Sequence, residues 1–217
     1  MTKKTLIAAG LLALAVVMAG CSAEYPGLKN PPADTQKAAA PKAPAIAQES
    51  LAHSDAGIKK YQNGDYAGAI AEFDQALEID KYNYQALSNK GVTLAMQGNQ
   101  TGNKETIRDG IGLIQQALQI YPDDVSSFYN LALALKIDGK YTVAITYFKK
   151  VLAADPNNTW SYYGIATIYG DEGKAPEANE YLKKAIDLGG EDVKEAARSQ
   201  SHFDKIRSDA DFQALVK

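Results

Sequence analysis

The chain has 217 residues, with 23 basic and 26 acidic side chains, and its formal net charge is −3. A mildly acidic chain without a basic stripe does not attract phosphate backbones, which excludes nucleic acid from the expected partners. Its single cysteine excludes a disulfide within one chain, so a folded domain must be stabilised by its own core.

The first twenty residues have the pattern of a secretory signal peptide. Lys3 and Lys4 form a positive end, and the uncharged, mainly apolar run that follows is short for a membrane span. We therefore expect residues 1–20 to be removed from the mature protein.

The end of that run, Val-Met-Ala-Gly-Cys at 17–21, resembles a bacterial lipobox. The resemblance implies that Cys21 becomes the N-terminus and is acylated, with palmitate among its lipids. It also implies a lipid-anchored protein of the bacterial cell envelope. With Ser22 next, the expected place is the outer membrane, facing the periplasm, in a diderm host. In a monoderm host it is the outer face of the plasma membrane.

Residues 21–49 comprise this cysteine and a tether. Five of the eight prolines fall in the tether, and the rest is largely alanine, lysine and small polar residues. Such a composition has few large apolar groups to bury and predicts a disordered, somewhat extended spacer.

Residues 50–192 contain one pattern four times, with a period near 34 residues, which is typical of an array of helical hairpins. Small residues at the eighth and twentieth positions let two helices approach closely, and a glycine at the fifteenth ends the first helix. The units are 50–83, 84–124, 125–158 and 159–192, and the expected helix-ending glycines are Gly64, Gly98, Gly139 and Gly173.

The segments GDYAGAIAEFDQALEID (64–80), GKYTVAITYFKKVLAADPNN (139–158) and GKAPEANEYLKKAIDLG (173–189) resemble the tetratricopeptide repeat. The resemblance implies an all-α, right-handed superhelical solenoid of four hairpins that holds other molecules. Residues 193–217 would form a C-terminal helical cap. Its apolar residues, which would cover the open end of the last hairpin, are Phe203, Ile206, Phe212 and Leu215.

The second unit is the irregular one, seven residues longer than the others. Its polar stretch 97–106 is either tolerated drift or a binding loop, and drift is favoured because lengthening a surface loop costs little. Asn103 is expected to cap a helix that starts near Lys104. Gly110 and Gly112 would each cost that helix roughly 1 kcal/mol, making this hairpin the softest.

No catalytic constellation, cofactor motif or metal site is evident, so the sequence does not predict an enzyme. Its two histidines, His53 and His202, lie far apart, and neither has the spacing of a zinc motif. Each is more typical of a packing or surface residue than of a catalyst.

The resemblance further implies a concave groove lined by the first helix of each hairpin. The Lys and Asn residues with which some family members grip a terminal carboxylate are absent, and aromatic and apolar residues stand there instead. Whether these residues form a binding surface or core packing stays open, and Trp160 could pack on a neighbouring hairpin or the end segment. The candidate binding residues are Tyr61, Val92, Met96, Tyr129, Leu133, Trp160 and Tyr163.

These features together predict a membrane-anchored envelope scaffold or adaptor that binds a protein or peptide segment in its groove. The alternative is a ligand-binding module for a lipid, a glycan or a peptidoglycan fragment. A homodimer formed through the ends of the array is a further possibility.

Overall fold

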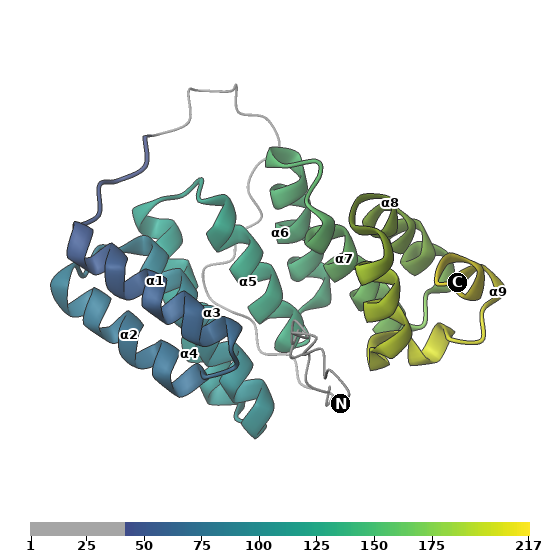
Figure 1. Cartoon of the computed structure of the whole chain (residues 1–217), viewed down its shortest axis with the longest axis horizontal. Helices are drawn as coiled ribbons and strands as arrows, with labels where there is room; N and C mark the ends of the chain where they lie inside the picture. Colours follow the sequence, from purple (N-terminus) through teal and green to yellow (C-terminus); the bar gives the residue numbers. More distant parts are fainter. Residues whose placement is uncertain (1–41) are drawn as a thin grey trace, which may run out of the picture.

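The computed structural model describes residues 42–217, which fold into successive helical hairpins followed by a shorter C-terminal segment (Figure 1). The predicted signal peptide, Cys21 and residues 22–41 of the predicted tether lie outside the described residues. The helices are α1 (Gln48–Gln62), α2 (Tyr66–Ile79), α3 (Tyr84–Thr101), α4 (Lys104–Ile120), α5 (Val125–Ile137), α6 (Tyr141–Ala154), α7 (Thr159–Glu172), α8 (Ala175–Ser199), the 3-10 helix η1 (Ser201–Ile206) and α9 (Ala210–Leu215).

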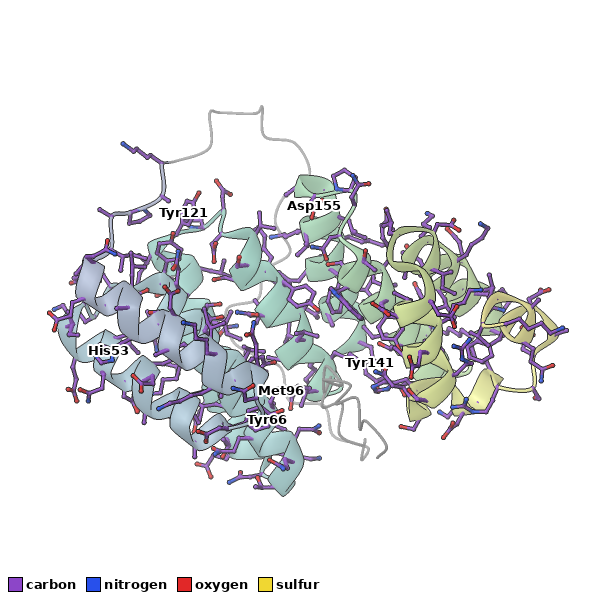
Figure 2. The ribbon with its side chains drawn as sticks, in the orientation of Figure 1. His53, Tyr66, Met96, Tyr121, Tyr141 and Asp155 are labelled. Atoms are coloured by element: carbon purple, nitrogen blue, oxygen red, sulfur yellow. The ribbon has the colours of Figure 1, made fainter. Side chains whose placement is uncertain are left out.

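Each odd-numbered helix from α1 to α7 packs against the helix that follows it. Successive hairpins are joined mainly through α2 with α3, α3 with α5, and α6 with α7. The turns between hairpins, marked by Tyr121 and Asp155, lie along one edge of the array, whereas Tyr66 and Tyr141 lie at the opposite edge (Figure 2). The predicted all-α solenoid of hairpins is confirmed.

Three of the four expected helix-ending glycines have the left-handed backbone that only glycine adopts freely, with φ of 75° to 77° at Gly64, Gly139 and Gly173. The prediction for Gly98 is wrong. The extra residues of the second unit lengthen both of its helices, so α3 continues to Thr101 and Gly102 ends it with φ of 70°. Asn103 caps α4 as expected, because its Oδ1 accepts hydrogen bonds from the amides of Glu105 and Thr106.

Small residues bring α3 and α4 into close contact, as their repeat positions predict. A Cβ atom at Gly91 would lie 2.5 Å from the carbonyl oxygen of Gly110, and one at Gly110 would overlap the carbonyl oxygen of Gly91. Among the residues that the structure describes, and apart from its chain neighbours and the adjacent backbone of α4, no atom lies within 4 Å of a Cβ placed at Gly112. Gly110 is therefore required by the packing, whereas Gly112 only weakens its helix.

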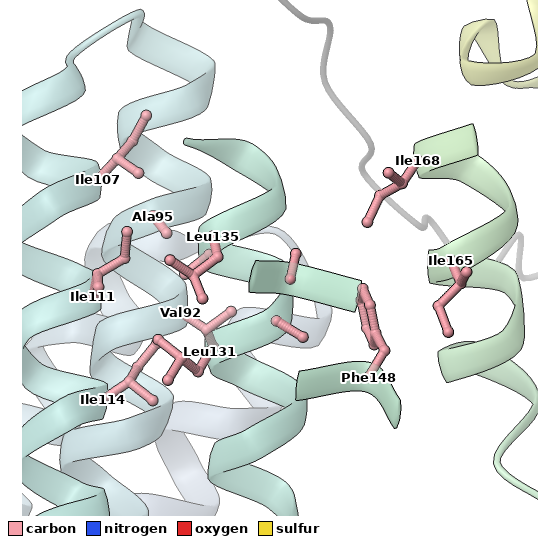
Figure 3. Packing of buried hydrophobic residues seen from close by; sticks show 13 residues of the cluster. Val92, Ala95, Ile107, Ile111, Ile114, Leu131, Leu135, Phe148, Ile165 and Ile168 are labelled. Atoms are coloured by element: carbon pink, nitrogen blue, oxygen red, sulfur yellow. The ribbon is translucent and has the colours of Figure 1, made fainter. Parts of the chain in front are cut away.

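The largest core cluster runs through the last three hairpins. Ile107, Ile111 and Ile114 of α4 face Leu131 and Leu135 of α5 (Figure 3). Phe148 of α6 points toward α7, where it meets Gly164 and the cluster residues Ile165 and Ile168 (Figure 3). Within the last three hairpins, this cluster is therefore continuous across hairpin boundaries.

The predicted tether ends earlier than expected. Ile46 packs against a cluster that includes Tyr84 and Leu87, and the amide of Ala47 donates to Asp80 Oδ2 at 3.1 Å. The chain therefore joins the array at Ile46 instead of Ser50.

The C-terminal segment covers the fourth hairpin. Helix α8 changes direction at Gly190, whose φ is 61° and ψ is −138°, and η1 then packs along α7. Phe203, Ile206 and Phe212 are buried there, but Leu215 is only half-buried and Val216 is buried in its stead. Asp209 caps α9 by accepting a hydrogen bond from the amide of Phe212.

Candidate functional site

A pocket of about 170 Å³ opens between the first helices of the first three hairpins. Helices α1 and α3 each supply three of its lining residues, and α2 and α5 each supply one. Within residues 42–217, every residue that lines it is uncharged: Ile58, Tyr61, Gln62, Phe73, Asn89, Val92, Thr93 and Asn130.

Two asparagines hold each other in place at this pocket. Nδ2 of Asn130 donates to the hydroxyl of Ser88 at 3.0 Å and to Oδ1 of Asn89 at 3.2 Å. These bonds use the donor of one amide and the acceptor of the other. An amide carries both groups, so the Oδ1 atom of Asn130 and the Nδ2 atom of Asn89 keep hydrogen-bonding capacity for a ligand.

The phenol of Tyr61, which lines the pocket, and that of Tyr129 on α5 remain neutral at neutral pH. Burial, with a smaller contribution from the nearby Tyr66, raises the pKa of Tyr61 to about 12. Burial also raises the pKa of Tyr129 well above its usual range, with a smaller contribution from Tyr61. The ring of Tyr129 packs edge-on against Phe148, with centroids 5.8 Å apart. The site is therefore apolar and hydrogen-bonding, without a charge of its own at neutral pH.

The structure does not bring all seven candidate binding residues together. Tyr61 and Val92 line the pocket, whereas Tyr129 is not among its lining residues and packs its ring against Phe148. Met96 is half-buried and lies toward the same edge of the array as Tyr66 (Figure 2), while Leu133 is half-buried against the large core cluster.

Tyr163 and Trp160 belong to the other end of the molecule. Tyr163 is 3% exposed, and its hydroxyl donates to Gln200 Oε1 at 2.7 Å. Its ring packs edge-on against those of Trp160 and Phe203, with ring centroids 5.7 and 5.9 Å apart, respectively. The prediction that Tyr163 lines an open groove is therefore wrong, because the residues that follow the repeats cover it. Trp160 is 37% exposed.

The sequence interpretation missed Asn89, Thr93 and Asn130. The two asparagines occupy the sixth position of their respective units, and none of the seven candidate binding residues stands at that position. The signal that could have found them is this recurrence of an amide at one repeat position.

A second polar cluster lies where η1 meets the array. Nζ of Lys136 is 3.3 Å from Nε2 of His202, and Nδ1 of His202 is 2.8 and 2.9 Å from the carboxylate oxygens of Asp171. Burial, partly offset by the neighbouring Asp171, lowers the pKa of Lys136 to about 8. His202 is thus a buried packing residue, not a surface one.

Replacing Lys136 with Met should remove one pH dependence of stability. Because the pKa of this amine falls from 10.5 to about 8 on folding, the unfolded chain holds a proton between these values that the folded chain has released. The free energy of unfolding should therefore rise with pH in that range, by about 1–2 kcal/mol between pH ~8 and ~9.5. Urea unfolding of both proteins measures the difference, and parallel pH profiles would contradict it.

An array of paired helices with an uncharged pocket on its first helices defines a helical-repeat scaffold for protein–protein interaction. The chain belongs to the tetratricopeptide repeat family, because family models with that description match residues 54–103, 113–145 and 135–201.

Known proteins with this fold include one curated relative and several solved structures. Tetratricopeptide repeat protein 7B of Mus musculus is 28% identical over 107 residues, which are 49% of this chain and only 12% of that protein. MamA (41-end) from Desulfovibrio magneticus RS-1 is 18% identical with a TM-score of 0.56, covering 79% of this chain and 95% of that one. A crystal structure of MamA protein is 19% identical with a TM-score of 0.54, covering 78% of this chain and 90% of that one. These likenesses support the fold alone.

Proposed function

We propose that this protein is a membrane-anchored scaffold of the cell envelope that holds a segment of a partner protein against its first three hairpins. The observation that supports the proposal is the uncharged pocket between α1, α3 and α5. Its apolar wall suits a medium-sized aliphatic side chain, and its amides suit the peptide groups on either side of that chain. The absence of charge from the pocket lining disfavours a terminal carboxylate as the recognised group.

The anchor in this proposal is a lipid on Cys21. Within the described residues, none of the helices is long and apolar enough to cross a membrane. The tether reaches the array at Ile46, beside the turn between the first two hairpins. A Cys21→Ser variant is expected to lose incorporation of a labelled fatty acid and to leave the membrane fraction. Unchanged fractionation and labelling would contradict the lipid anchor.

The binding proposal is tested by placing a photo-crosslinking residue at Gln62, which lines the pocket, or at Gln75, which is exposed on α2. In cells, Gln62 is expected to crosslink a defined envelope protein and Gln75 is not. Equal products from both positions would contradict a pocket site, as would retention of the protein by purified peptidoglycan without any protein partner.

A second test of the binding proposal introduces a charge into the pocket. Ile58 and Ile70 are both half-buried isoleucines of the first hairpin, but only Ile58 lines the pocket. Ile58→Lys should weaken binding of the captured segment at least about tenfold, because an ammonium is desolvated there without a partner. Ile70→Lys should leave the affinity unchanged. Matched melting temperatures of the two variants are the control.

Catalysis, a cofactor and nucleic acid have no part in this proposal. Among the described residues that line the pocket, the phenol of Tyr61 and the hydroxyl of Thr93 are the groups that could act as an acid, a base or a nucleophile.

A further inference from the structure

The pocket between α1, α3 and α5 has the size of one side chain. Its volume is about 170 Å³, whereas sites for drug-sized ligands take about 300–1,000 Å³. Ile58, Phe73 and Val92 give it an apolar lining, and Asn89 and Asn130 stand beside them. A single aliphatic side chain, with peptide groups on either side that meet the two amides, therefore fits it better than a whole small molecule does.

The N-terminal part of the chain joins the array near this pocket. Ile46 packs against the cluster of Tyr84 and Leu87, and α1 begins at Gln48. The later turns of α1 supply residues 58, 61 and 62 of the pocket lining. At about 1.5 Å of rise per residue, these positions lie about 15–21 Å along α1 from its start. The end of the tether is therefore within reach of the pocket.

The predicted tether contains one branched aliphatic side chain. Within residues 22–45, the large apolar side chains other than those of the prolines are Tyr25 and Leu28. Leu28 stands in the sequence Pro-Gly-Leu-Lys, so the peptide groups on both of its sides have an N–H donor. The peptide group after Tyr25 belongs to Pro26 and has none. Leu28 is therefore the tether residue that matches both the apolar lining and the two amides.

The length of the tether suits a contact between Leu28 and the pocket. Residues 29–45 separate Leu28 from Ile46. A flexible chain of that length has a root-mean-square span of roughly 24 Å, which is close to the distance along α1 that has to be bridged. Effective concentration is highest under that condition and is about millimolar for a short flexible link. A contact with a Kd of ~1 mM or below is therefore at least about half filled within a single chain.

We propose that the tether occupies the pocket when no partner is bound, with Leu28 against the apolar lining and the adjoining peptide groups against Asn89 and Asn130. This inference rests on the proposed function in that it assigns the same pocket. A partner segment then has to displace Leu28, which lowers the apparent affinity of the array for segments that fit the pocket poorly.

Displacement would also change the reach of the array from the proposed lipid anchor. With Leu28 in the pocket, the stretch from Cys21 to Leu28 links the lipid to the binding site and spans at most ~23 Å. After release, the stretch from Cys21 to Ile46 extends to ~80 Å. Binding of a partner would therefore let the array move away from the membrane.

Crosslinking within the purified chain tests the contact without any partner. The protein is the mature chain from residue 21 with Cys21→Ser, and a photo-crosslinking residue replaces Gln62, which lines the pocket. The expected product joins position 62 to residues 25–31 of the same molecule, in a yield that is independent of protein concentration. A crosslinker at Gln75, which is exposed on α2, should not give it. Absence of the product, or a yield that rises with concentration, would overturn the proposal.

Substitutions in the tether test the assignment of Leu28 and lie outside the folded array. Leu28→Asp should lower the yield at least about tenfold, because a carboxylate without a partner is costly to bury among apolar groups. Ala33→Asp places the same charge at a nearby tether position and should keep the yield of the parent chain. Equal yields from the two variants would contradict the assignment.

Affinity for a free peptide gives an independent measurement. A peptide of residues 22–34 should bind the Leu28→Asp chain at least about fivefold more tightly than it binds the Ala33→Asp chain, in which the tether still competes. Equal affinities, or no binding to either chain at ~5 mM peptide, would overturn the proposal. Because neither measurement contains a partner protein, failure of this inference leaves the expected crosslink from Gln62 to an envelope protein in cells unaffected.

Discussion

Replacing Gly110 with Ala is expected to lower the free energy of unfolding by about 2–3 kcal/mol, although alanine is the better helix former by about 1 kcal/mol. The added methyl group would overlap the carbonyl oxygen of Gly91, and a Cβ at Gly110 would also lie 3.0 Å from the amide nitrogen of Ala95. Backbone atoms cannot rotate away as a flexible side chain can. Helices α3 and α4 would therefore have to separate along their contact.

The same substitution at Gly112 provides the control. Outside the adjacent backbone of α4, an added Cβ meets no atom of residues 42–217 within 4 Å there, so Gly112→Ala should raise the free energy of unfolding by about 0.5–1 kcal/mol. Urea unfolding of the two variants and the wild type measures both changes in the free energy of unfolding, which should have opposite signs. Equal changes at the two positions would show that α3 and α4 do not approach as closely as described.

The repeat pattern predicted the backbone well where the unit length is constant. Gly64, Gly139 and Gly173 end their helices because each hairpin needs a left-handed residue at its turn. Gly98 has the same place in the alignment but lies inside α3, where a Cβ would come within 2.7 Å of the Asn103 carbonyl oxygen. A glycine that permits close packing and one that ends a helix look alike in a sequence.

The site was only partly predictable for a related reason. Tyr61 and Val92 could be assigned to the groove because repeat position fixes which way a first-helix residue points. Repeat position does not fix what covers that residue. Tyr163 is equivalent to Tyr129 in the repeat, yet η1 and Gln200 bury it, and their place depends on the turn of the chain at Gly190.

The same dependence on neighbours explains the cluster around His202. Lys136, Asp171 and His202 lie in three different elements, and no local spacing connects them. The sequence indicates only that His202 follows the repeats. Its partners become evident once η1 lies on α7.

Removing the ring of Phe148 is expected to be the most damaging single change, with a loss of about 3–5 kcal/mol in Phe148→Ala. This side chain is fully buried and comes from the third hairpin, but it fills the space beside Gly164 of the fourth. A Cβ on Gly164 would lie 2.6 Å from the ring, so the glycine and the phenylalanine fit each other. Truncation would leave a cavity between the two hairpins, with Tyr129 losing its edge-on partner.

Because that cavity lies between two hairpins, Phe148→Ala should change the number of unfolding transitions as well as the free energy of unfolding. In a repeat array, each unit is stabilised by its neighbours, so weakening one junction lets the parts unfold separately. Trp160 reports on the fourth hairpin alone, whereas helical circular dichroism reports on all of them. The two probes should give separate transitions in urea for Phe148→Ala and coincident ones for the wild type.

Phe128→Ala is the control, because the half-buried ring of Phe128 meets Tyr147 and Lys150 within one hairpin. It should cost about 1–2 kcal/mol and keep the transitions together. Coincident transitions in Phe148→Ala would mean that the core is not coupled through this ring.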